Sequence, residues 1–169
     1  DTRQVAQRES DGIPAVRGAL KALQALERHR GLSTMAIEGN AGAQAERSAM
    51  QADVTRSMDA LTALTSLAQN PAVKTELTKA QDGWRRLREK SAAPEWKLAD
   101  SMAHHNDLIE QVLVVSDLLT DDFGLSLDPE VDTYQLIQYS MVLLPPYIEE
   151  LGKVRAVGAG ALTRGKRTD

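Results

Sequence analysis

Apolar residues recur at intervals of three and four along almost the whole chain, and this spacing limits the possible folds more than any other feature. The segment after Asn70-Pro71 follows an unbroken 4-3-4-3 spacing through Val73, Leu77, Ala80, Trp84 and Leu87. That period places all five on one side of an α-helix. Aromatic residues make up only 4% of the chain, and no strong run of Val, Ile and Tyr predicts a strand. The pattern therefore predicts an all-α protein.

Helix-stop and helix-start signals divide this pattern into five helical segments. The predicted segments are a first helix ending at Gly39-Asn40, then 44–68, 71–92, a fourth from Ala93-Pro94 to Gly124, and a last opening at Asp128-Pro129. The stripe of the last helix, which we expect to face the core, is Tyr134, Ile137, Met141, Leu144, Ile148, Leu151, Arg155 and Leu162.

The first and last segments are long, and both ends of the chain carry helices that we expect to continue into membrane spans. Such an arrangement needs an even number of passes, whereas five segments are counted. The simplest solution joins 44–68 and 71–92 into one pass broken at Asn70-Pro71. The predicted fold is an elongated antiparallel four-helix bundle with long first and last helices and a broken second pass. The pattern alone leaves two separate passes open.

Composition and motifs exclude several classes of function. The net charge of −4 makes a nucleic acid an unlikely partner, and the absence of cysteine excludes disulfides, thiolate nucleophiles and cysteine-based zinc sites. The sequence has no nucleophile elbow, glycine-rich phosphate loop or H-E-x-x-H helix. We therefore predict no enzymatic activity, no catalytic residues and no cofactor.

Three histidines could suggest a metal site. His104 and His105 are adjacent and point to different faces of a helix, and His29 is expected to lie far from His105 in the assumed bundle. The preferred interpretation is a core histidine at position 105, near Trp84, and no metal site.

Two quoted stretches carry a resemblance to a known class of domain. They are "LQALERHRGLSTMAIEGN", residues 23–40, and "LSLDPEVDTYQLIQYSMVLLPPYIEELGKVRAVGAGAL", residues 125–162, with His105, Leu108 and Ile109 between them. In this order they resemble the extracytoplasmic sensor regions of bacterial chemotaxis receptors, histidine kinases and cyclic-di-GMP enzymes. The chain is similar to the four-helix-bundle and nitrate-sensor-like groups. It departs from many relatives at Gln135, where they carry a second tyrosine, and at Pro145-Pro146.

The resemblance implies a single periplasmic sensor domain, residues 1–169, excised from a longer membrane protein whose flanking transmembrane helices are absent here. It implies a homodimer in the full-length receptor and a helix shift as the signal. The expected ligand is a small molecule, anionic in view of Arg30: an organic acid, an amino acid or an oxyanion. One alternative is a module that reads a partner protein or the state of the envelope without a pocket of its own. Another is a helical spacer.

Arg30 and Ser33 occupy positions on the first helix where the apolar stripe asks for leucine. In the assumed up-down-up-down bundle, Ser116 and Gln138 fall at the level of Arg30, with Tyr134 and Tyr139 within about two turns. The predicted ligand-binding residues are Arg30, Ser33, Ser116, Tyr134, Gln138 and Tyr139. The alternative is structural: Arg30 pairs with an acid such as Asp132 or with backbone carbonyls, because a buried unpaired charge costs several kcal/mol.

Overall fold

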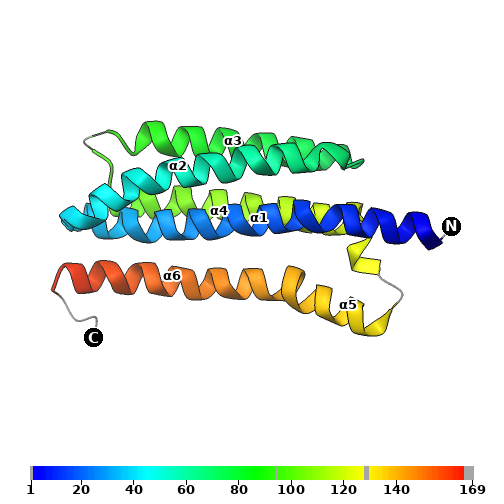
Figure 1. Ribbon diagram of the computed structural model, residues 1–169. Coiled ribbons are helices and arrows are strands. Elements are labelled where there is room, and N and C mark those ends of the chain that lie inside the picture. The colour runs from blue at the N-terminus through cyan, green and yellow to red at the C-terminus, as the bar shows by residue number, and fades with distance from the viewer. Residues whose placement is uncertain (1, 94, 128–129, 166–169) are drawn as a thin grey trace.

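The computed structural model describes residues 2–93, 95–127 and 130–165 (Figure 1). Its α-helices are α1 (Thr2–Ile37), α2 (Ala41–Leu64), α3 (Pro71–Lys90), α4 (Leu98–Asp122), α5 (Val131–Ile137) and α6 (Leu144–Thr163). Two 3₁₀ turns, Thr65–Leu67 and Leu125–Leu127, and a π-helical segment, Gln138–Leu143, complete the described elements. All regular structure in these ranges is helical, which confirms the all-α bundle. The predicted starts at Pro94 and Asp128-Pro129 fall outside the described residues.

Local chemistry sets the helix boundaries in the first half of the chain. Gly39 adopts a φ of 99°, which favours glycine, and ends α1. The side chain of Asn40 then accepts a hydrogen bond from the backbone N–H of Ala43, and Asn70 does the same for Ala72 at the start of α3. The stop at Gly39 and the cap at Asn70 lie where the sequence predicted them, whereas α2 begins at Ala41 rather than at Gln44, with Asn40 as its cap.

The α2 and α3 helices are two separate passes, so the predicted broken second pass is wrong. Gln81 donates to Thr62 near the turn, and Trp84 donates to Thr55 further from it, a pairing that only antiparallel helices give. The carboxylate of Asp122 at the end of α4 accepts hydrogen bonds from the backbone N–H groups of Gln69 and Asn70. These long-range bonds hold the reversal between α2 and α3, and no local sequence pattern contains them.

An odd number of passes changes the directions of the later helices. Arg8 contacts Asp122 and Arg30 contacts Asn106, so α4 runs antiparallel to α1. Contacts of α1 with α6 increase together along both helices, from Arg30–Glu149 to Glu38–Arg164, so α6 runs parallel to α1. The described chain therefore begins and ends at opposite ends of the bundle (Figure 1), so the even number of passes expected from the sequence is wrong.

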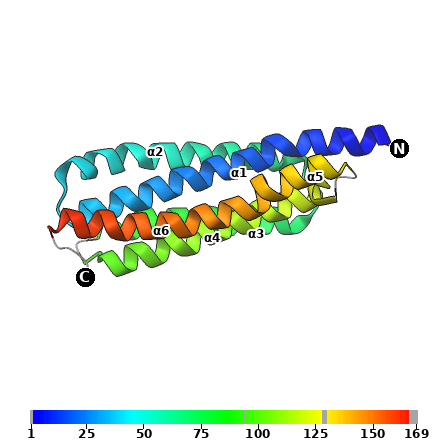
Figure 2. The ribbon, with the colours of Figure 1, turned by 90° about the horizontal axis from the view of Figure 1, so that it is seen from below.

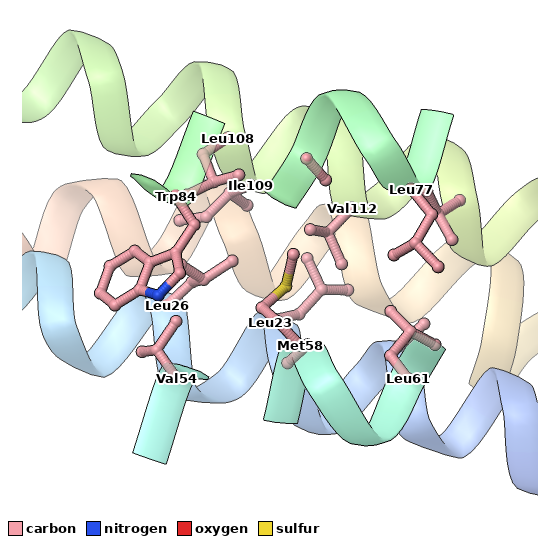
Figure 3. Close-up of a cluster of buried hydrophobic side chains, with 14 of the residues drawn as sticks. Leu23, Leu26, Val54, Met58, Leu61, Leu77, Trp84, Leu108, Ile109 and Val112 are labelled. Atoms are coloured by element: carbon pink, nitrogen blue, oxygen red, sulfur yellow. The ribbon is translucent and has the colours of Figure 1, made fainter. Parts of the chain in front are cut away.

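The hydrophobic core lies inside the bundle of α1, α2, α3 and α4. Every member of the predicted α3 stripe is buried, and Figure 3 shows Leu77 and Trp84 among apolar side chains of the other three helices. Seen from below, α6 lies in front, between α1 and α4 (Figure 2). Among the described residues, α6 supplies none to the contiguous core cluster. It is a fifth helix attached to the outside.

The buried face of α6 is not the predicted one. Leu144, Ile148, Leu151, Arg155 and Leu162 were expected inside, yet all five are exposed. The residues that face α1 and α4 are instead small or polar: Pro145, Glu149, Gly152, Ala156, Gly160 and Ala161. A Cβ atom on Gly160 would lie 2.7 Å from Cγ2 of Thr34, so the absence of side chains lets α6 approach α1 closely.

The π-helical segment precedes Pro145-Pro146 directly. Proline has no N–H to donate to the preceding turn, and the wider π turn accommodates the missing bonds. In the part of the chain that the structure covers, none of the helices combines the length and the apolar character needed to cross a membrane.

Candidate functional site

Arg30 is fully buried where α1, α4 and α6 meet. Its Nη1 donates to Oε1 of Glu149 at 2.5 Å and to Oδ1 of Asn106 at 2.8 Å, and its Nη2 donates to Oε2 of Glu149 at 2.9 Å. The two nearly parallel bonds to Glu149 form the fork geometry in which a guanidinium holds a planar anion. Its Nε has no hydrogen-bond partner among the described residues.

The backbone of α6 makes room for this pair at Gly152. A Cβ atom there would lie 2.8 Å from Nη2 of Arg30 and 3.7 Å from Oε2 of Glu149. Lys153, one turn after Glu149, donates to Oε1 of the exposed Glu150 at 2.6 Å, and its amine also lies 4.0 Å from Oε1 of Glu149. The ion pair is thus enclosed by a glycine on one side and reinforced by a cation at its edge.

A second carboxyl group, on Glu27, stands beside the pair. Burial raises the pKa of Glu27, the negative charge of Glu149 raises it further, and Arg30 and Arg155 oppose the rise. The cluster therefore combines two carboxylates with nearby cations from α1 and α6.

A groove of about 740 Å³ between α1 and α6 opens next to this cluster. Glu27 connects the two, because it lines the groove and its carboxyl carbon lies 4.0 Å from the Cβ position of Gly152. The other lining residues are Leu20, Leu23, Gln24, Arg28, Gly31, Leu32, Met35, Ser140, Leu144, Pro145, Ile148, Arg155, Ala156 and Ala159. The groove therefore reaches the cluster at Glu27, while Arg30 and Glu149 lie behind this residue and do not line the groove.

A pair of buried histidines, His29 on α1 and His105 on α4, lies beside Arg30. Nδ1 of His29 is 2.8 Å from Nε2 of His105, which corrects the expectation that they lie far apart. Nδ1 of His105 must carry a proton, because it is 2.6 Å from the carbonyl oxygen of Ser101, which can only accept. His29 therefore donates to His105, and its own Nε2 is an unpartnered acceptor among the described residues.

Both histidines are neutral at physiological pH. Burial lowers the pKa of His29 to about 3 and that of His105 to about 4, with a further contribution from the charge of Arg47. The Trp84 ring packs edge-on against His29, with ring centroids 5.1 Å apart. Within the described ranges, no group of three or more His, Cys, Asp or Glu side chains could hold a metal ion. The pair is a polar layer inside the four-helix core.

The structure does not gather the six predicted site residues. Ser33 is buried close to Arg30 but faces His29, with its Oγ 3.5 Å from Nδ1. Ser116 is buried on α4 at about 15 Å along the helix from Asn106, at 1.5 Å per residue. Tyr134, Gln138 and Tyr139 precede Glu149 by about 15 to 22 Å along the chain axis, and both tyrosines are exposed. Ser116 and Gln138 do not lie at the level of Arg30 along the bundle, because α4 and α6 run in the opposite directions to those assumed.

Sequence reasoning missed Glu149, Asn106 and Gly152, and it placed the structural partner of Arg30 at Asp132. One signal could have found Glu149. It belongs to a stripe of proline, glycine, alanine and glutamate, Pro145, Glu149, Gly152, Ala156 and Gly160, that recurs at helical spacing. Small residues around one acid are typical of a close helix contact that encloses a buried cation.

Comparison with known proteins gives one match. The sequence model of the family described as nitrate and nitrite sensing matches residues 21–169. A search of curated proteins and a search of solved structures each found no match.

Proposed function

The chain belongs to the nitrate and nitrite sensing family, and we propose that it binds one of these small planar oxyanions through Arg30. It is an extracytoplasmic, periplasmic sensor domain of a membrane receptor, as the sequence resemblance predicted. The proposal selects the oxyanion among the three ligand classes expected from the sequence. It retains Arg30 from the predicted site residues and adds Glu149 and Asn106.

The geometry around Arg30 supports a planar anion. A guanidinium matches carboxylate with two parallel hydrogen bonds, and nitrate and nitrite offer the same pair of oxygens in one plane with one negative charge. In the structure the carboxylate of Glu149 occupies that position. The unpartnered Nε–H of Arg30 supplies a further donor. Glu149 is therefore an internal stand-in for the ligand.

Binding follows as a competition. An oxyanion that enters from the groove replaces Glu149 on Arg30, and the displaced carboxylate turns toward Lys153, whose amine already lies 4.0 Å away. Because Glu149 joins α6 to α1, its release changes the free energy of the contact between these helices. A ligand shifts a conformational equilibrium only through different affinities for the two states, and this exchange gives such a difference.

The signal in this proposal is a movement of α6 relative to α1. The full-length receptor is a homodimer whose output is that of a chemoreceptor or a histidine kinase. The Arg30–Glu149 pair is the single observation that carries the proposal, because it is a buried two-point anion site whose occupant, a carboxylate, is supplied by the neighbouring helix α6.

Thermal unfolding at constant ionic strength tests the ligand. Nitrate and nitrite should raise the melting temperature with saturation, since a ligand that binds only the folded state stabilises it by mass action. Chloride tests whether a monovalent anion without the planar shape has the same effect, and acetate tests whether any carboxylate does. Equal shifts with all four anions would reduce the effect to ionic strength. No shift with any of them would favour a module that reads a partner protein.

A further inference from the structure

The outward face of α6 is apolar over its whole length. Most of the large apolar side chains exposed in the described chain belong to residues 131–162, although the core lies elsewhere. On α6 itself they are Leu144, Tyr147, Ile148, Leu151, Val154, Val157 and Leu162, and Leu143 precedes them. A continuous stripe of this kind on a soluble surface marks a contact with another molecule.

The stripe has the period of a two-helix interface. Leu144, Tyr147, Leu151, Val154 and Gly158 follow each other at intervals of three and four, which are the a and d positions of a heptad. This row lies opposite the buried face that carries Glu149 and Gly152. A Cβ atom on Gly158 would meet nothing within 4 Å, so a partner helix could approach closely there.

The residues that flank the row select the partner and its direction. In a parallel pair of identical helices, each residue before an a position faces the residue five places later on the other helix. Glu150 then faces Arg155 of the second copy, while Leu143 faces Ile148 and Val157 faces Leu162. Glu150 and Arg155 are both exposed. In an antiparallel pair, the position of Glu150 in the heptad would face the same heptad position of the other helix, and so would that of Arg155. The pairing of Glu150 with Arg155 would then be lost.

We propose that this α6 face, Leu143–Leu162, binds the same face of a second copy of the chain in a parallel, twofold-symmetric pair. The proposal deepens the homodimer of the proposed function and rests on it for the existence of a dimer, but not for the ligand. Leu144, Ile148 and Arg155 also line the groove beside Arg30. The groove therefore borders the proposed interface, and a movement of α6 is a movement of the dimer contact.

The absence of cysteine from the chain makes disulfide trapping a direct test. Tyr147→Cys and Val154→Cys should each form a disulfide-linked homodimer under mild oxidation, at rates that rise with protein concentration. Ala52→Cys, an exposed position on α2, is the matched control. In a mixture of the two variants, a disulfide between position 147 of one copy and position 154 of the other, with neither variant forming a disulfide with its own kind, would mean an antiparallel pair. This result would overturn the proposal. So would rates equal to that of the control at the highest soluble concentration.

Sedimentation equilibrium supplies the second arm. Val154→Glu replaces an exposed side chain, so the monomer should fold normally and the dissociation constant should rise at least tenfold. Glu150→Arg alone should weaken association, and Glu150→Arg with Arg155→Glu should restore it. If Val154→Glu associates like the wild type, the surface is wrong. The melting-temperature response of Val154→Glu to nitrate, recorded in parallel, shows separately whether anion binding holds.

Discussion

Arg30 on α1 and Glu149 on α6 join two parallel helices through two hydrogen bonds of 2.5 and 2.9 Å, with both side chains at most 5% exposed. A pair this deeply buried is a poor source of net stability, because each ion loses its hydration. Removal of only one of the two side chains is nevertheless strongly destabilising, because the other charge then stays buried without a partner. The pair therefore behaves as a latch between α1 and α6, and its two halves give different predictions.

Arg30→Met should lower the free energy of unfolding by about 3 kcal/mol or more, because Glu149 remains buried without its partner. The double variant Arg30→Met with Glu149→Met should recover most of this loss, and both should lose the response to nitrate. Urea denaturation and the thermal-shift titration measure the two effects. A single variant as stable as the double one would show that Glu149 does not depend on Arg30.

Glu149→Gln should bind nitrate at least tenfold more tightly, about 1.4 kcal/mol, because the internal competitor for the Arg30 fork loses its charge. Glu110→Gln is the matched control, since it removes the same charge from an exposed residue of α4. Calorimetric titration gives both affinities. Unchanged or weaker binding in Glu149→Gln would refute the competition while leaving an Arg30 site possible.

Gly152→Ala should destabilise the fold by about 1 to 2 kcal/mol despite the better helix propensity of alanine. Its Cβ would lie 2.8 Å from an Arg30 nitrogen that Glu149 holds in place. Gly158→Ala, in open space on the same helix, should instead gain about 0.5 to 1 kcal/mol. Denaturation at low protein concentration compares them. Equal gains at both positions would mean that the guanidinium moves aside freely.

The His29–His105 pair should make the fold sensitive to acid. Both histidines take up a proton near pH 6.5 when unfolded, but only near pH 3 to 4 when folded. The unfolded state therefore binds more protons in between, so stability is complete above pH 6.5 and falls as the pH drops toward 4. His29→Gln with His105→Gln should flatten this dependence by a few kcal/mol. An unchanged slope between pH 6.5 and 4 would assign the acid sensitivity to other groups.

Local pattern was enough to predict the helices but not their directions. The α3 stripe from Val73 to Leu87 is buried as predicted, because burial on one face needs only the right period. Asn70-Pro71 starts a helix equally well whether the chain continues or reverses. The reversal depends on Asp122, whose carboxylate receives the backbone of the turn from more than fifty residues away.

The candidate site was harder to predict for a related reason. Arg30 was identified because a charge interrupts an apolar stripe, but its partner depends on which helix lies beside it. The assumed directions pointed to Asp132 and to Ser116, Gln138 and the tyrosines. The wrong face of α6 was predicted to be buried, because hydropathy alone does not show whether an apolar face lies in the core or is exposed. Leu151 and Leu162 were predicted to face the core and are more than half exposed in the structure.

The position of α6 outside the four-helix core has a consequence for the order of folding. The α1–α2 and α3–α4 pairs form between neighbours in the chain, whereas Arg30 and Glu149 are separated by 119 residues. Closing that long loop costs chain entropy, and little apolar burial offsets the cost. We expect α6 to dock last during folding and to detach first during unfolding, as a local unit that opens at a lower free energy than the four-helix core. Native-state hydrogen exchange should then release the α6 amides well before those of α1 to α4, so that the sensor can open without unfolding.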